Sequence, residues 1–186
     1  MIINIRGTSG SGKSTLMKGV MAQYLHKLNI KKEGRKQPIA HVLQNEGRRS
    51  LLIPGHYGIA CGGCDTISSY EEIYDMVRRG DDEGMDVLYE GLLISGESAR
   101  PIALKQEGRD IHVIALNTPL DVCIASINER RRAKRGPDAP PVKEKNTIAK
   151  ARAVEIAVRK MQEAGIPCHS LDRDGALAKV RELLGL

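Results

Sequence analysis

The sequence predicts an α/β fold in which a five-stranded parallel sheet is covered by helices on both faces. Short apolar runs alternate with segments of helical periodicity along the chain. These runs are nearly continuous rather than alternating with polar residues, as expected for strands buried on both faces. Because 186 residues suffice for one domain with a full core and are few for two, we expect a single domain over residues 1–186.

The predicted strands are apolar runs of five or six residues, which is the usual length of a buried strand. Those of the core sheet cover residues 1–6, 50–54, 86–90, 111–116 and 167–171. A further strand-like run covers residues 39–44. Since parallel sheets bind ligands at the carboxyl ends of their strands, functional residues are expected directly after Ile5, Pro54, Tyr89, Leu116 and Leu171.

The first predicted helix covers residues 13–28, where Met17, Met21, Tyr24 and Leu28 share one face. Ser69 and Glu72 have the spacing of a capping box, which predicts a second helix over residues 69–79. Thr118 and Pro119 open another helix, with proline at its first position. The remaining helices are predicted over residues 97–107, 147–164 and 174–184.

The loop after the first strand carries the P-loop pattern Gly7-x-x-x-x-Gly12-Lys13-Ser14, with a predicted strand before it and a predicted helix after it. Its backbone N–H groups and the positive end of the helix dipole suit a phosphate chain. We expect Lys13 to reach the β- and γ-phosphates and Ser14 to supply a hydroxyl to Mg²⁺. The pattern therefore predicts a site for ATP and Mg²⁺, formed by Gly7, Thr8, Ser9, Gly10, Ser11, Gly12, Lys13, Ser14 and Thr15.

Two carboxylates follow predicted core strands. Glu90 ends an apolar strand at the Walker B position, where a carboxylate orients Mg²⁺, usually through water. Asp65 stands between the strand at 50–54 and the next helix, where a kinase needs a base for the proton of the acceptor hydroxyl. The alternatives are a structural carboxylate at a strand end for Glu90, and a turn or helix-leading residue for Asp65.

The positive charge is concentrated in one segment. Residues 130–152 carry nine basic and two acidic residues, so this segment has a charge of +7 and the rest of the chain −1. The segment follows the strand at 111–116, where small P-loop kinases have a mobile lid with arginines that contact the transferred phosphoryl group. We expect a lid over about residues 130–147, with Arg131 and Arg135 among the catalytic residues. The alternative is a solvated basic helix face.

Composition and cysteine content predict a reduced protein of the cytoplasm. The four cysteines (Cys61, Cys64, Cys123 and Cys168) are few for a secreted disulfide scaffold. Neither a secretory signal nor an apolar run long enough for a membrane span is present. We interpret Cys61-Gly62-Gly63-Cys64 as a tight turn that lines an acceptor pocket, while a redox dithiol or a metal site that includes His56 remain alternatives.

Among P-loop proteins, several classes are disfavoured. The guanine signature Asn-Lys-x-Asp of GTPases is absent, and 186 residues leave little room for the second domain of a motor. Five tyrosines with no phenylalanine or tryptophan argue against an aromatic platform for single strands. A kinase remains the favoured class.

The chain as a whole resembles small P-loop kinases of the nucleoside and nucleotide kinase type. More narrowly, "PGHYGIACGGCDTI" and "VLYEGLLIS" resemble phage-encoded 5-hydroxymethyluracil DNA kinases, which phosphorylate the hydroxymethyl group of a modified base in DNA. The resemblance implies ATP binding by Gly7 to Ser14 and matches Asp65 and Glu90 to the base and magnesium positions. It also implies DNA as a partner, in the cytoplasm of a host cell, and Tyr57 is our candidate for stacking on the target base.

Three functions remain open from the sequence alone. The first is a DNA-base kinase, and the second is a kinase for a free nucleoside, nucleotide or other small metabolite. The third is a P-loop switch that binds ATP without acceptor chemistry. A segment of charge +7 suits DNA phosphates as well as ATP, but no recognisable DNA-binding motif is present.

Overall fold

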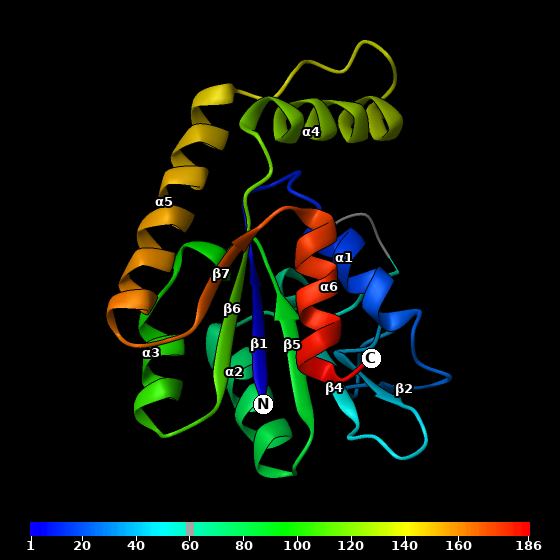
Figure 1. The fold of residues 1–186 in the computed structure, drawn as a ribbon. Coiled ribbons are helices and arrows are strands. Elements are labelled where there is room, and N and C mark those ends of the chain that lie inside the picture. Colours follow the sequence, from blue (N-terminus) through cyan, green and yellow to red (C-terminus); the bar gives the residue numbers. More distant parts are fainter. Residues whose placement is uncertain (59–61) are drawn as a thin grey trace.

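The computed structural model describes residues 1–58 and 62–186, and Figure 1 shows their fold. Over these residues, seven strands form one sheet in the order β2-β3-β4-β5-β1-β6-β7. The strands are β1 (Ile2–Arg6), β2 (His26–Ile30), β3 (Ala40–Gln44), β4 (Leu51–Pro54), β5 (Asp86–Glu90), β6 (Ile111–Leu116) and β7 (Cys168–Leu171).

The predicted five-stranded parallel sheet is correct for part of the sheet only. Strands β4, β5, β1, β6 and β7 pair in parallel and coincide with the five predicted core strands. The sheet is mixed, however, because β3 pairs antiparallel with both β2 and β4. The run at 39–44 is thus a strand of the same sheet, and β2 is a strand where a helix was expected.

The predicted helix over residues 13–28 is wrong beyond Met21, where α1 (Lys13–Met21) ends. Residues 26–30 pair with β3, and Leu28, predicted on the buried face of the helix, is 61% exposed. Most of β2 is exposed, so it lacks the apolar pattern of a strand. Its conformation depends on antiparallel pairing with β3, the next strand along the chain, and local helical periodicity does not report such cross-strand pairing.

The other helices follow the sequence predictions closely. Ser69 caps the second helix, since its Oγ accepts the N–H of Glu72 at 3.0 Å, as predicted. This helix continues past Gly80, whose missing side chain lets the helix pack closely against Leu52. The helices after α1 are α2 (Tyr70–Asp82), α3 (Ala99–Gln106), α4 (Leu120–Arg135), α5 (Glu144–Glu163) and α6 (Arg173–Leu184), with short 3₁₀ turns η1 (Cys64–Thr66) and η2 (Ile94–Gly96).

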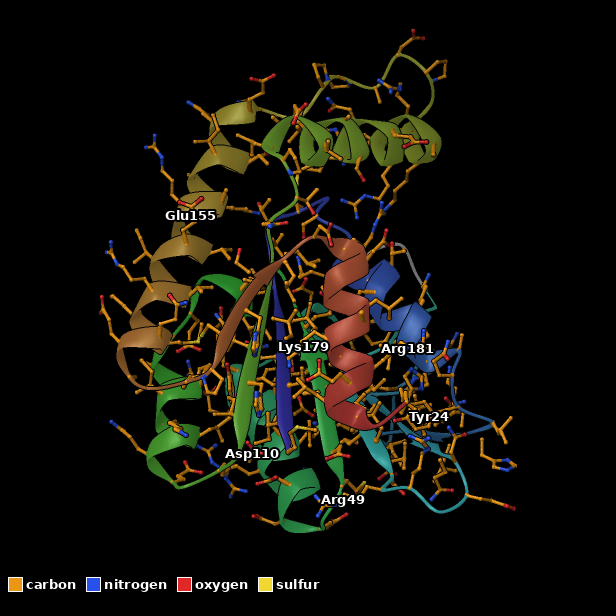
Figure 2. The ribbon with its side chains drawn as sticks, viewed as in Figure 1. Tyr24, Arg49, Asp110, Glu155, Lys179 and Arg181 are labelled. Atoms are coloured by element: carbon orange, nitrogen blue, oxygen red, sulfur yellow. The ribbon has the colours of Figure 1, made fainter. Side chains whose placement is uncertain are left out.

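Helices cover both faces of the sheet, as predicted. Helices α1 and α6 pack on one face, around Met17 and Val180, and helices α2, α3 and α5 pack on the other, around Val77 and Met161. Figure 2 shows side chains filling the space between the sheet and these helices, whereas the labelled Glu155 and Arg181 belong to exposed helix positions.

Arg6 is a fully buried charged residue at the end of β1. Its guanidinium donates to Asn4 Oδ1 and to the backbone carbonyls of Ser95 and Glu97. These bonds provide partners for Nε and Nη1 of a charge that is costly to bury, while Nη2 has no partner among the described residues. They also attach the segment that follows β5 to β1.

Helix α4 lies across the end of the sheet where β1, β5 and β6 terminate (Figure 1). The basic run from Arg130 to Arg135 forms its last turns, and a loop over residues 136–143 leads into α5. Helix α5 therefore begins at Glu144 rather than Thr147. Among the described residues, no helix combines the length and the apolar character that crossing a membrane requires.

Candidate functional site

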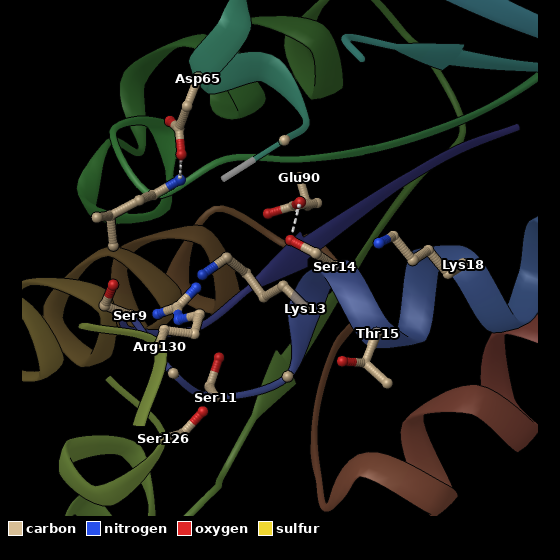
Figure 3. A pocket seen from close by; sticks show the side chains of 14 residues that line it. Ser9, Ser11, Lys13, Ser14, Thr15, Lys18, Asp65, Glu90, Ser126 and Arg130 are labelled. Carbon is tan, nitrogen blue, oxygen red and sulfur yellow. Dashed lines mark hydrogen bonds between the residues drawn. The ribbon is translucent and has the colours of Figure 1, made fainter. Parts of the chain in front are cut away.

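A cavity of about 270 Å³ opens at the carboxyl edge of the sheet (Figure 3). The P-loop and the first residues of α1 form one wall. The opposite wall comes from the segment between β4 and α2, from the end of β5 and the residues after it, and from α4. Outside the P-loop and α1, the lining residues are Gly62, Asp65, Glu90, Leu92, Ser126 and Arg130.

The P-loop residues adopt a conformation that suits an anion. Gly10 and Gly12 have φ angles of +82° and +99°, which favour glycine over residues with a side chain. No side chain caps the first turn of α1. The N–H groups of this turn are therefore available to an anion, and the helix dipole adds to their attraction.

Lys13 is buried beside this loop, with 7% of its surface exposed. Its ammonium donates to the carbonyl oxygens of Gly7 at 2.7 Å and Thr8 at 3.1 Å. Burial lowers the pKa of Lys13, and the nearby Glu90 and Asp65 carboxylates act in the opposite direction.

Glu90 and Ser14, both predicted to serve the metal, lie in contact. The Ser14 hydroxyl donates to Glu90 Oε1 at 2.9 Å (Figure 3). Glu90 is 2% exposed, and burial raises its pKa to about 6, against the effects of the Lys13 ammonium and the Ser14 hydrogen bond. The pair presents carboxylate and hydroxyl oxygens together, which are the donors that Mg²⁺ prefers.

Asp65 lines the same cavity from the other side, within η1. Its carboxylate accepts the backbone N–H group of Leu92 at 2.8 Å (Figure 3) and that of Leu93 at 3.1 Å. The side chain is thereby fixed to the segment after β5 while remaining exposed. The sequence predicts that Asp65 and Glu90 lie at the same edge of the sheet, and in the structure both residues line one cavity.

The structure brings a different arginine to the cavity from those predicted. Arg130 lines it together with Ser126, one helical turn earlier on α4. Arg131 and Arg135 are not among the described lining residues, and Arg135 is exposed. The helical register of α4 separates these positions, and that register depends on tertiary packing rather than on the local sequence.

Tyr57 does not present a ring face to the P-loop cavity. It is 5% exposed and packs in the core under α1. Cys61 and its predicted turn with Cys64 lie partly outside the described residues, and Cys64 itself is buried at the start of η1. Over residues 1–58 and 62–186, no three His, Cys, Asp or Glu side chains are grouped as a metal site.

A second cavity, of about 290 Å³, lies on the other side of the P-loop and was missed by the sequence reasoning. Thr118, at the end of β6, donates through its hydroxyl to the Ser11 carbonyl at 2.8 Å. Arg173, at the start of α6, lies against Gly12. The only signal for these residues was their place after predicted strands, because neither belongs to a local motif.

The loop, the buried lysine and the serine–carboxylate pair at the edge of an α/β sheet define a P-loop nucleotide-binding protein. No family model matches the chain. The 5-hmdU DNA kinase of Pseudomonas phage PaMx11 is 49% identical to it over 98% of this chain and 96% of that protein. The chain therefore belongs to the family of 5-hmdU DNA kinases.

Other similar proteins are more distant. The 5-hmdU DNA kinase of Pseudomonas phage M6 is 25% identical over 98% of this chain and 96% of that protein. Two structures of M. mycoides deoxyadenosine kinase, one of them with bound dATP, align over the whole chain with TM-scores of 0.46 and 0.47 and identities of 15% and 14%. Similarity at that level carries no argument about the site.

Replacing Gly10 with alanine tests the packing of the P-loop against α4. A Cβ at Gly10 would lie 2.3 Å from the Cys123 carbonyl oxygen, whereas Gly84 has a similar φ of +75° and nothing within 4 Å. Both substitutions incur the cost of a positive φ, about 1–2 kcal/mol. Urea unfolding should show Gly10→Ala to be the more destabilising by about 2 kcal/mol or more. Equal losses would contradict the close approach.

Proposed function

We propose that this protein is an ATP-dependent kinase that phosphorylates the hydroxymethyl group of 5-hydroxymethyluracil in DNA. The observation that carries the proposal is the convergence of Lys13, the Ser14–Glu90 pair and Asp65 on one cavity. The relative that is 49% identical is named for the same chemistry. We assign to each of these residues the role that the sequence predicts for it.

In this proposal, the P-loop residues Gly7 to Thr15 bind the triphosphate of ATP. The N–H groups of the loop and the Lys13 ammonium stabilise the negative charge that develops on the transferred phosphoryl group. The second cavity, beside Thr118 and Arg173, offers space for the nucleoside part of ATP. Ser14 and Glu90 would hold Mg²⁺, which supplies charge neutralisation at the β- and γ-phosphates.

The acceptor hydroxyl approaches from the side of Asp65. Its oxygen forms a bond to the γ-phosphorus as the bond from that phosphorus to the β,γ-bridging oxygen breaks, and ADP leaves. The proton of the hydroxyl passes to the Asp65 carboxylate, which the N–H groups of Leu92 and Leu93 hold in position. Because phosphoryl transfer needs mainly positioning and electrostatic stabilisation, these few groups suffice for the reaction.

The basic segment supports a DNA acceptor and a closing element. Its charge of +7 covers the end of α4 and the start of α5, at the edge of the sheet where the cavity opens. The 5-hydroxymethyl group projects into the major groove, where a protein reaches it more readily than the ring atoms. We infer that Arg130 acts as the residue of this segment that contacts the transferred group.

A transfer assay tests the function directly. ATP labelled at the γ-phosphate is offered with Mg²⁺ and 5-hydroxymethyluracil DNA, ordinary DNA or free 5-hydroxymethyl-2′-deoxyuridine. Label should enter only the modified DNA, and Lys13→Ala should lower its rate by about 10² to 10³-fold. Transfer to the free nucleoside alone would assign a small-molecule kinase. ATP hydrolysis without transfer to any acceptor would indicate a P-loop switch rather than a kinase.

Substitution of the two carboxylates separates their roles. Asp65→Asn retains an oxygen for the Leu92 N–H but removes the base, so the turnover number should fall by about 10²-fold or more with little change in ATP affinity. Glu90→Gln should lose activity that is partly recovered at high Mg²⁺. Turnover is measured across a magnesium titration for both variants. Magnesium rescue of Asp65→Asn and not of Glu90→Gln would show that the roles are reversed.

Arg130 and Arg135 provide a matched pair on α4. Arg130→Met should lower the turnover number by about tenfold or more at saturating ATP and DNA, because its guanidinium faces the cavity and acts on the transition state. Arg135→Met removes the same charge from an exposed position outside the cavity and should chiefly weaken DNA binding. Equal losses of turnover would contradict a specific role for Arg130.

A further inference from the structure

A third cavity, of about 370 Å³, lies beside the P-loop cavity, between α1 and the antiparallel strands β2 and β3. Its walls are largely apolar, but three ring side chains with polar atoms line it. His41 stands on β3, opposite Ile53 of β4, and His56 and Tyr57 follow the end of β4. The cavity therefore lies at the same edge of the sheet as the P-loop.

Each of these three side chains has a buried polar atom without a hydrogen-bond partner among the described residues. These atoms are His41 Nε2, His56 Nδ1 and the Tyr57 hydroxyl. His41 is 2% exposed and Tyr57 is 5% exposed. The His41 ring centroid lies 6.3 Å from that of His56 and 6.4 Å from that of Tyr57. Buried polar groups are normally paired, so three unpaired groups around one cavity point to a polar ligand.

The contacts of His41 determine whether its unpaired Nε2 donates or accepts a hydrogen bond. Its Nδ1 lies 2.7 Å from Asn29 Oδ1, an atom that only accepts, so Nδ1 carries the proton. Burial lowers the pKa of His41 to about 4, with a smaller contribution from Lys27, and the ring is therefore neutral at pH 7. The unpaired Nε2 is then a hydrogen-bond acceptor. Burial raises the pKa of Tyr57 well above its usual value, so its hydroxyl keeps its proton and can donate.

The third cavity and the P-loop cavity are neighbours. Lys18 of α1 lines both of them. Gly62, which lines the P-loop cavity, approaches the backbone of the third: a Cβ at Gly62 would lie 2.4 Å from the His56 carbonyl oxygen and 3.2 Å from Tyr57 Cα. A ligand in the third cavity would thus lie beside Lys18, which also lines the phosphate site.

We propose that this cavity receives the target pyrimidine after it leaves the DNA stack, with His41 Nε2 accepting the N3–H of the uracil ring and the Tyr57 hydroxyl donating to a ring carbonyl. The inference rests on the function proposed above. Enzymes that act on one base in DNA commonly turn it out of the helix into such a pocket and bind its pairing edge. Tyr57 then contacts the base through its hydroxyl, not by stacking as the sequence suggested.

This assignment predicts selectivity between two modified bases. Uracil offers an N–H donor at N3, whereas cytosine has an unprotonated nitrogen there. A cytosine in the cavity would place that lone pair against the lone pair of His41 Nε2. The same hydroxymethyl group on cytosine should therefore be a poor acceptor, because the ring that carries it does not bind.

Tyr57→Phe is the first test, made on a duplex with one 5-hydroxymethyluracil. The Michaelis constant for this DNA should rise by about fivefold or more, the effect of one lost hydrogen bond, while ATP affinity and the melting temperature do not fall. Tyr24→Phe is the control, since Tyr24 follows α1, packs against the same core cluster and does not line the cavity. An unchanged Michaelis constant in Tyr57→Phe would overturn the assignment.

His41→Gln is the second test, made on single-stranded oligonucleotides so that base pairing does not contribute. The unmodified protein should favour 5-hydroxymethyluracil over 5-hydroxymethylcytosine by about tenfold or more in kcat/KM. Glutamine can either donate or accept, so the variant should lose most of this preference. Equal use of both bases by the unmodified protein, or full selectivity in the variant, would overturn the assignment.

A fluorescent reporter distinguishes an extruded base from a free nucleoside. 2-Aminopurine beside the target in a duplex should brighten when the unmodified protein binds, and it should brighten less with Tyr57→Phe. Phosphorylation of the duplex without brightening would overturn base extrusion while leaving the kinase intact. Absence of transfer to any modified DNA would instead refute the proposed function itself, so the two failures are separable.

Discussion

The buried ammonium of Lys13 is the constraint around which the carboxyl edge of the sheet is organised. A cation removed from water is tolerated only where polar partners surround it. The carbonyls of Gly7 and Thr8 provide these partners directly, and the Glu90 carboxylate supplies the opposing charge nearby. The glycines shape the loop that holds those carbonyls, and β5 sets the position of Glu90. Sheet, loop and helix are thus arranged around one positive charge.

The carboxylates of Glu90 and Asp65, both near Lys13, have different surroundings, which is consistent with different roles. Glu90 is buried and tied to a hydroxyl, while Asp65 is exposed and held by two backbone N–H groups. The segment after β5 receives Asp65 on one side and the buried Arg6 on the other. It therefore joins the Asp65 side of the cavity to β1. Positioning at this level is what phosphoryl transfer requires of a protein.

Local patterns were sufficient for the parallel core and the phosphate loop, because both depend on residues close in sequence. The N-cap at Ser69 followed in the same way. Asp65 and Glu90 were expected at one edge because each follows a predicted parallel strand. Strand β2 was missed because its residues are mostly exposed, so its antiparallel pairing with β3 leaves no apolar pattern in the sequence. Arg130 was missed because the register of α4 depends on tertiary packing. The unpaired atoms around His41 were inaccessible to sequence reasoning, since they come from separate segments.

The antiparallel strands β2 and β3 also affect how copies of the molecule contact one another. In the described part of the chain, β2 ends the strand order on that side, so one of its backbone edges pairs with no strand. An open strand edge favours pairing with another molecule and thereby aggregation. Lys27 lies within β2 and Lys31 follows it directly, while Lys32 is ion-paired with Glu72. A second copy that approached edge to edge would bring the Lys27 and Lys31 charges of both molecules together, so these two lysines disfavour growth of the sheet between molecules.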